Sequence, residues 1–149
     1  MDIFEAIKTR HSVRSYSDKK IEPEKVEKLT KIIKKINAES GLDFQLITDE
    51  PEGFTGTMAH YGSFKGVKNY FVLAGPKKKD YEVGYYGEKL VLAAQMLGLN
   101  TCWVALTFNK RKAKYTLKKG EKLIVDLEAD EVDGWVAVKS GATEGYVSA

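Results

Sequence analysis

Two long helical patterns separated by short apolar runs limit the folds that this chain can adopt. From Pro23 to Ile36, apolar residues recur at helical spacing with lysines and glutamates on the other face, which is typical of a helix that lies on a core. A second helical pattern runs from about Tyr81 to Leu97. Runs typical of strands occupy 44–48, 70–74, 101–105, 122–127 and 135–138. Because helices and strands do not alternate strictly, the order favours an α+β fold over a doubly wound one.

Local signals predict where these elements begin and end. Asp2, with Glu5 three residues later, predicts the start of a short helix. Pro23 stands at the first position of the next predicted helix, and Gly98 follows the last turn of the long one. The continuous apolar run 70–74 predicts a strand buried on both faces.

Bulk composition narrows the functional classes. A chain of 149 residues is expected to form one domain, and a net charge of +3 is small for a nucleic-acid binder. The two histidines, His11 and His60, have no second ligand at zinc-site spacing, so we expect no metal. The chain has a single cysteine, no stretch long enough to span a bilayer and no signal-peptide pattern. We therefore expect a cytoplasmic protein.

The segment RHSVRSY, residues 10–16, is the strongest candidate for a binding site. In an extended backbone, alternate side chains share a face, so Arg10, Ser12 and Arg14 would point the same way. Two guanidinium forks and a hydroxyl are suitable donors for a phosphate group. A solvated basic turn is the simpler interpretation of the same residues.

The remaining residues offer little catalytic chemistry of their own. The chain has neither a G-x-G-x-x-G turn nor a Walker A string. Cys102, in an apolar run, is expected to be an inert core thiol, and no acid–base pair stands out. If the chain is an enzyme, a cofactor is expected to supply its reactivity.

Three segments resemble a known family. The opening helix that runs into RHSVRSY, together with GEKLVLAAQMLGLNTCWVALTF at 87–108, is similar to nitroreductase-like FMN-dependent oxidoreductases. NAESGLDFQLITDE at 37–50 resembles a thermophile-type branch of these nitroreductases. The resemblance implies one FMN-binding domain over 1–149 with a central, mainly antiparallel sheet flanked by helices. Its C-terminal segment, from about 124, is atypical of the family.

The resemblance also implies a site and an activity. FMN would lie at the interface of a homodimer and pass electrons from NAD(P)H to a nitroaromatic, quinone or similar small acceptor. The chemistry would belong to the flavin N5 atom and to no catalytic side chain. The residues implied in cofactor binding are Arg10, His11, Ser12 and Arg14 for the phosphate and ribityl chain, and Ser40, Gly41, Leu42, Val104, Ala105 and Leu106 for the flavin ring.

Two other functions stay open at this point. A flavin-binding module without turnover, for storage or sensing, would carry the same motifs, and reduction of the bound flavin by NADH separates it from the enzyme. A small nucleic-acid-binding domain would need aromatic residues on a basic face. The grouped tyrosines Tyr81, Tyr85 and Tyr86 lie instead on a helix predicted to form core or interface.

Overall fold

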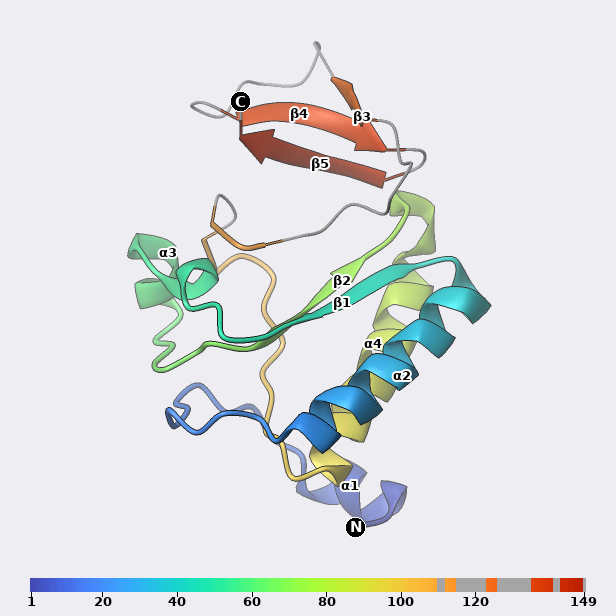
Figure 1. The fold of residues 1–149 in the computed structure, drawn as a ribbon, viewed down its shortest axis with the longest axis vertical. Coiled ribbons are helices and arrows are strands. Elements are labelled where there is room, and N and C mark those ends of the chain that lie inside the picture. The colour runs from blue at the N-terminus through green and yellow to red at the C-terminus, as the bar shows by residue number, and fades with distance from the viewer. Residues whose placement is uncertain (110–111, 115–122, 126–134, 141–142, 149) are drawn as a thin grey trace.

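The computed structural model describes residues 1–109, 112–114, 123–125, 135–140 and 143–148. These residues form an α+β protein (Figure 1). Its elements, in chain order, are α1 (Ile3–Thr9), α2 (Pro23–Ser40), β1 (Asp43–Ile47), the short 3₁₀ helix η1 (Glu52–Phe54), α3 (Thr57–Tyr61), β2 (Tyr70–Ala74), the 3₁₀ helix η2 (Lys77–Lys79), α4 (Asp80–Met96), β3 (Leu123–Val125), β4 (Trp135–Ser140) and β5 (Thr143–Ser148).

The core lies between α2, α4 and the antiparallel pair β1–β2. In Figure 1 the two long helices lie side by side along the pair of strands. Leu29 and Leu90, from the two helices, and Phe44 from β1 are almost fully buried there. Asn37 of α2 ties helix to strand, because its side-chain amide donates to the Phe44 carbonyl at 2.9 Å and its oxygen accepts from the Phe44 N–H at 2.8 Å. Apolar packing and a satisfied polar pair therefore fix α2 on β1.

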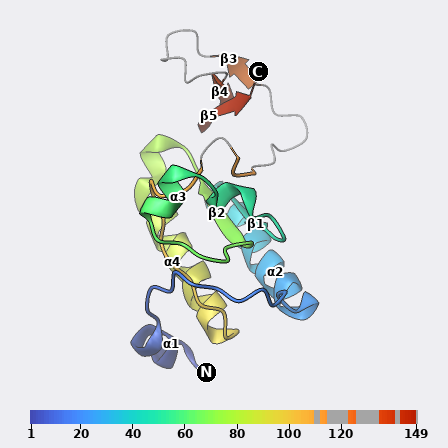
Figure 2. The same cartoon turned by 90° about the vertical axis from the view of Figure 1, so that its left-hand side faces the viewer.

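The predicted helix ends are confirmed. The Asp2 carboxylate accepts a hydrogen bond from the Glu5 N–H at 2.9 Å at the start of α1. Pro23 opens α2, and Gly41 ends it in the left-handed conformation at φ +68°. After α4, Gly98 also adopts a left-handed φ of +74°, which favours glycine. Figure 2 shows α1 beside the C-terminal end of α4, against which it packs.

Several strand predictions need correction. The run 101–105 is not a strand, because only Thr101 makes a bridge, to Ser12. The β2 strand matches the predicted bounds but is half-buried rather than buried on both faces, because among the described strands it pairs with β1 alone. β5 was not predicted at all. It pairs with β4 in an antiparallel sheet of order β3-β4-β5.

The described strands therefore form a two-stranded and a three-stranded sheet, each antiparallel. The single central sheet and the single domain over 1–149 that the resemblance implies remain predictions. The predicted turn at 133–134 lies outside the described residues. Within the described part of the chain, no helix is both long and apolar enough to cross a membrane.

A buried carboxylate, Glu50, joins three segments of the chain at the start of β2. Glu50 is only 3% exposed, and it accepts hydrogen bonds from the N–H groups of Glu52 and Gly53 at 2.9 and 3.1 Å and from the Tyr70 hydroxyl at 2.6 Å. The Tyr70 oxygen in turn accepts from the Lys114 N–H at 2.9 Å. We call these five residues the Glu50 cluster. It joins the loop before η1 to β2 and to residues 112–114.

Two pKa values in the Glu50 cluster move in opposite directions. Burial raises the pKa of Glu50, but the hydrogen bonds from Tyr70, Gly53 and Glu52 together outweigh it and leave that pKa below its ordinary value. Burial, and then the hydrogen bond to Glu50, raises the pKa of Tyr70 to about 12. Glu50 is therefore an acceptor and Tyr70 a donor at neutral pH.

Candidate functional site

The segment 10–16 runs extended between two other parts of the chain. The Val13 N–H donates to the Thr101 carbonyl at 3.0 Å. On the other side, the Lys65 N–H donates to the Arg14 carbonyl and the Tyr16 N–H donates to the Lys65 carbonyl, each at 2.9 Å. These bonds hold the backbone in place without a sheet, so its side chains are free to serve a binding site.

Two residues make this close packing possible. Gly66 has a φ of +69°, and a Cβ there would collide with the Tyr16 carbonyl oxygen, so only glycine fits beside the segment. The Tyr16 hydroxyl donates to the Val13 carbonyl at 2.5 Å. Burial, with a smaller contribution from the nearby Cys102, raises the pKa of Tyr16 to about 12. The neutral hydroxyl therefore pins the end of the segment back on its middle.

Arg10 occupies the turn between α1 and this segment, and its side chain faces α4. Its Nε lies 3.7 Å from Oε1 of Glu88. Its Nη1 is buried and has no hydrogen-bond partner among the described residues. Burying a charged donor without an acceptor costs free energy, so this guanidinium is suited to binding an added anion.

The other three residues predicted to bind the phosphate, His11, Ser12 and Arg14, lie nearby on the same segment. His11 and Ser12 are exposed, and His11 Nδ1 lies 3.1 Å from the Thr9 carbonyl oxygen. Arg14 is also exposed, with its guanidinium carbon 5.8 Å from the centre of the Phe64 ring. The two arginines thus share one segment but contact different elements, α4 and the chain after α3.

Residues 101–106 follow the point where Thr101 bonds to the segment 10–16. The Oγ1 atom of Thr101 is buried and, like Arg10 Nη1, has no hydrogen-bond partner in the described part of the chain. Val104 is half-buried, whereas Ala105 and Leu106 are exposed. No described residue accepts a hydrogen bond from the backbone N–H groups of these last three residues. Three backbone donors next to one another are therefore available to a ligand.

The environment of Cys102 corrects one expectation. The thiol is not packed in the core, because Cys102 is half-buried and its Sγ lies 3.5 Å from the Trp103 carbonyl oxygen. The reason is that 101–105 is not a core strand but a segment on the side of α4. Among the described residues, no group of three His, Cys, Asp or Glu side chains could hold a metal ion.

Ser40, Gly41 and Leu42 lie elsewhere, at the C-terminal end of α2. The Ser40 hydroxyl donates to the Ile36 carbonyl at 2.6 Å and accepts from the Leu42 N–H at 3.1 Å, and Lys79 donates to the Ser40 carbonyl. Leu42 is fully buried. Lys79 precedes α4 whereas Glu88 is in its middle, so the positions that the two groups of predicted residues contact lie roughly 13 Å apart along the helix axis.

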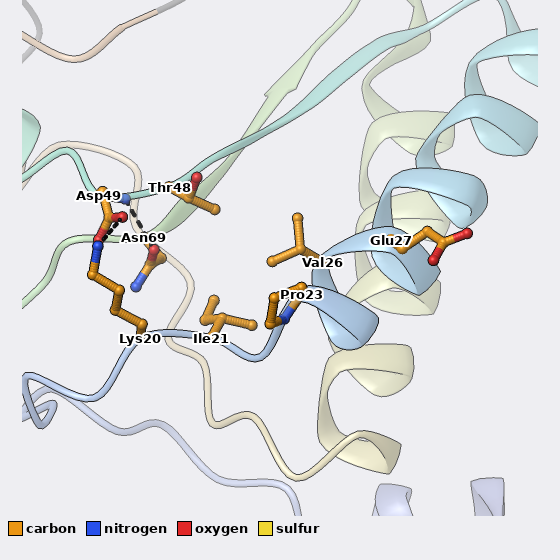
Figure 3. Close-up of a pocket in the computed structure, with 8 residues that line it drawn as sticks. All are labelled: Lys20, Ile21, Pro23, Val26, Glu27, Thr48, Asp49 and Asn69. Carbon is orange, nitrogen blue, oxygen red and sulfur yellow. Dashed lines mark hydrogen bonds and ion pairs between the residues drawn. The ribbon is translucent and has the colours of Figure 1, made fainter.

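A shallow pocket beside the start of α2 contains none of the predicted residues (Figure 3). It is lined by Lys20, Ile21, Pro23, Val26, Glu27, Thr48, Asp49 and Asn69. Lys20 and Asp49 form an ion pair at 3.0 Å across it, and the Asn69 side-chain oxygen accepts from the Asp49 N–H at 3.1 Å. Glu27, the third charged residue of the lining, is paired with Lys31 at 2.7 Å, so each charged group of the pocket already has a partner.

Sequence reasoning missed three residues of the site: Thr101, Trp103 and Glu88. The indole N–H of Trp103 donates to Oε2 of Glu88 at 2.9 Å, the same carboxylate that faces Arg10. Trp103 and Glu88 both lie within the segment that carries the family resemblance. Nothing in the local pattern singled them out, because a glutamate on a helix is usually a solvated surface residue.

Comparison with known proteins identifies the family. Residues 2–127 match the family described as "Putative TM nitroreductase". No curated protein and no solved structure matches the chain. The match covers the segments 10–16 and 101–106, helix α4 and the Glu50 cluster. It supports an oxidoreductase enzyme. The chain belongs to this nitroreductase-like family.

Proposed function

We propose that the protein is an FMN-dependent NAD(P)H oxidoreductase of the nitroreductase type. The observation that carries the proposal is a pair of buried donors, Nη1 of Arg10 and Oγ1 of Thr101, that have no partner among the described residues. They lie on two segments joined by the Ser12–Thr101 bridge. A phosphate group offers several acceptor oxygens and a double negative charge. The donor set therefore fits the phosphate end of FMN.

The residues would divide the flavin between them. Arg10, Ser12, His11 and Arg14 would bind the phosphate and the ribityl chain. The N–H groups of 104–106 would donate to the edge of the flavin ring. When bound, FMN would supply the redox chemistry, taking a hydride from NAD(P)H and passing electrons to a nitroaromatic, quinone or similar acceptor.

Backbone donors suit this task because they need no titration. An N–H group at the ring edge stabilises negative charge wherever it develops, and it is held in place before the reaction begins. The half-buried Val104 and the exposed Ala105 and Leu106 leave that edge open to a small acceptor. The proposal therefore requires no acid or base side chain.

We also propose a homodimer. Large apolar side chains are exposed on α1, at Phe4 and Ile7, and on α4, at Tyr81, Tyr85 and Met96. The three α4 residues share one face of the helix, and α1 packs against the same helix. An apolar surface of this kind is typical of an interface, and two-fold symmetry is the commonest arrangement. A second copy could bring its Ser40 and Gly41 to a flavin held by Arg10, whereas Leu42 is enclosed in the core.

The first experiment identifies the cofactor. Protein purified, or reconstituted with flavin, is expected to show flavin absorption, and heat is expected to release FMN, identified by chromatography. The motive for FMN over FAD is one basic segment and no glycine turn for a pyrophosphate. Release of FAD, or failure to bind flavin after reconstitution, would contradict the proposal.

The second experiment separates the enzyme from a binding module. Under anaerobic conditions, NADH or NADPH is expected to bleach the yellow colour, and a nitroaromatic or quinone is expected to restore it. A flavin-loaded protein that neither cofactor bleaches would be a storage or sensing module. Sedimentation of the loaded protein tests the homodimer, and a flavin-loaded monomer would remove that part of the proposal.

A further inference from the structure

One carboxylate, Glu88, contacts both segments of the proposed site, 10–16 and 101–106. Its Oε2 accepts the indole N–H of Trp103 at 2.9 Å, and its Oε1 lies 3.7 Å from Nε of Arg10. Glu88 belongs to α4, Arg10 to the segment 10–16, which would bind the phosphate, and Trp103 to the segment 101–106. A single side chain on a rigid helix thus contacts both segments that would hold the flavin.

The position of Glu88 is fixed by its neighbour Gly87. A Cβ at Gly87 would lie 2.5 Å from Cη2 of Trp103 and 3.0 Å from Cδ1 of Leu73, so only glycine leaves room for the indole ring against α4 at this turn. The indole then places its N–H on the Glu88 carboxylate. Because both the ring and the helix are rigid, Oε1 is held in a defined place beside Arg10.

Glu88 acts on one edge of the Arg10 guanidinium. A guanidinium is planar, so fixing its Nε edge also fixes the direction of its two terminal nitrogens. Those terminal nitrogens include Nη1, which has no partner among the described residues. We propose that Glu88 is a positioning residue, which holds Arg10 by Nε so that its terminal nitrogens are oriented for the phosphate of FMN.

This inference rests on the proposed function, and it makes a prediction opposite to that from charge alone. A carboxylate close to an anion site repels the anion. If Glu88 did nothing but repel, its removal would strengthen FMN binding. If it orients Arg10, its removal weakens FMN binding, because the guanidinium loses its fixed direction and the entropy of ordering it must then be supplied on binding.

Two variants and two ligands test the assignment. The dissociation constants of FMN and riboflavin are measured by titration of flavin fluorescence for the full chain, for Glu88→Ala and for Glu88→Gln. We expect Glu88→Ala to weaken FMN binding about tenfold, the cost of ordering one long side chain that the ion pair no longer holds. Riboflavin, which has no phosphate, is expected to bind equally well to Glu88→Ala and to the unmodified chain. Glu88→Gln keeps acceptor oxygen on the side chain and is expected to restore FMN affinity to within about threefold.

The control is Glu27→Gln, which removes an exposed ion pair with Lys31 at 2.7 Å in α2. It is expected to change neither dissociation constant. If Glu88→Ala binds FMN as tightly as the unmodified chain, or more tightly, Glu88 does not position Arg10. If FMN and riboflavin affinities fall together, the residue is structural and the proposal is overturned. If the unmodified chain binds no flavin, the proposed function fails first, and this inference fails with it.

A second route covers the case in which Glu88→Ala does not fold. Trp103→Phe keeps an aromatic ring against Gly87 but removes the N–H that anchors Glu88. It is expected to reduce the preference for FMN over riboflavin by about threefold, less than Glu88→Ala because the carboxylate remains. An unchanged preference in a folded Trp103→Phe protein would contradict the anchoring step.

Discussion

Glu50 and Glu88 each join segments that are far apart in the chain, yet their surroundings differ. Glu50 is buried, and three donors from β2 and the η1 loop surround it at hydrogen-bond distance. Glu88 is half-exposed and receives one short hydrogen bond, from Trp103. Arg10 beside it keeps a buried nitrogen that has no partner in the described part of the chain. A closed set of hydrogen bonds is what a structural tie needs, whereas unused donors are what a binding site needs. The following predictions test that division.

The largest effect is expected from Glu50→Ala. Three donors lose their acceptor inside the protein, so the free energy of unfolding should fall by about 3 kcal/mol. Urea denaturation measures the loss. The control is Glu52→Ala, which removes only an exposed pair with Lys112 at 2.6 Å and should cost about 0.5 kcal/mol or less. A loss below about 1 kcal/mol for Glu50→Ala would mean that the Glu50 cluster is not a structural tie.

Arg10→Ala should have the reverse profile. FMN binding is expected to weaken by about 1.5–3 kcal/mol, the range for hydrogen bonds to charged groups. The free energy of unfolding should change little, because the guanidinium makes no short hydrogen bond to a described residue. Lys8→Ala, which removes an exposed positive charge in the last turn of α1, is the control for charge alone. Normal FMN affinity in Arg10→Ala would reduce the segment to a solvated basic turn.

Acid should weaken the Glu50 cluster and leave the contacts of Glu88 with Arg10 and Trp103 unaffected. The folded pKa of Glu50 lies below its ordinary value, so its stabilising contribution is complete above about pH 5 and is lost as the pH falls through the folded pKa. Stability measured from pH 7 to pH 3 should therefore fall further in the unmodified chain than in Glu50→Gln. Because exposed carboxylates such as Asp18 and Glu24 also titrate with lowered pKa values, the difference between the two proteins is the informative quantity. Parallel curves would contradict the assignment.

The smallest effect is expected from Cys102→Ser. The thiol is half-buried and lies outside the cluster formed by Arg10, Glu88 and Trp103. The rate of flavin reduction by NAD(P)H should therefore stay within about threefold, a barrier change of roughly 0.7 kcal/mol or less. Stopped-flow absorbance measures this rate. Loss of turnover in a folded, flavin-loaded variant would make the thiol part of the mechanism.

The same division explains what could be predicted from the sequence. Helix ends depend on residues within one turn, and Asp2, Pro23 and Gly98 all mark them correctly. The run 101–105 is apolar enough for a strand, but its neighbours are a helix and a loop, and a strand requires a strand beside it. β5 was missed because a short stretch with Gly145 and little alternation gives no strand signal.

The site divides in the same way. The phosphate segment could be found because Arg10, Ser12 and Arg14 stand close together in the sequence. The contacts of Glu88 with Arg10 and Trp103 could not, since they depend on how α4 packs against two distant segments. Local patterns indicated where a ligand could bind but not which side chains hold the binding groups in place.

The hydrogen bond between Val13 and Thr101 has a consequence for folding during synthesis on the ribosome. A ribosome makes about 5 to 20 residues per second, so roughly 4 to 18 seconds pass between the synthesis of Val13 and that of Thr101. The long helices α2 and α4 and the β1–β2 pair lie between these two positions and can pack during that time. We therefore expect the nascent chain to build its apolar interior first and to acquire affinity for flavin only when residue 101 has emerged.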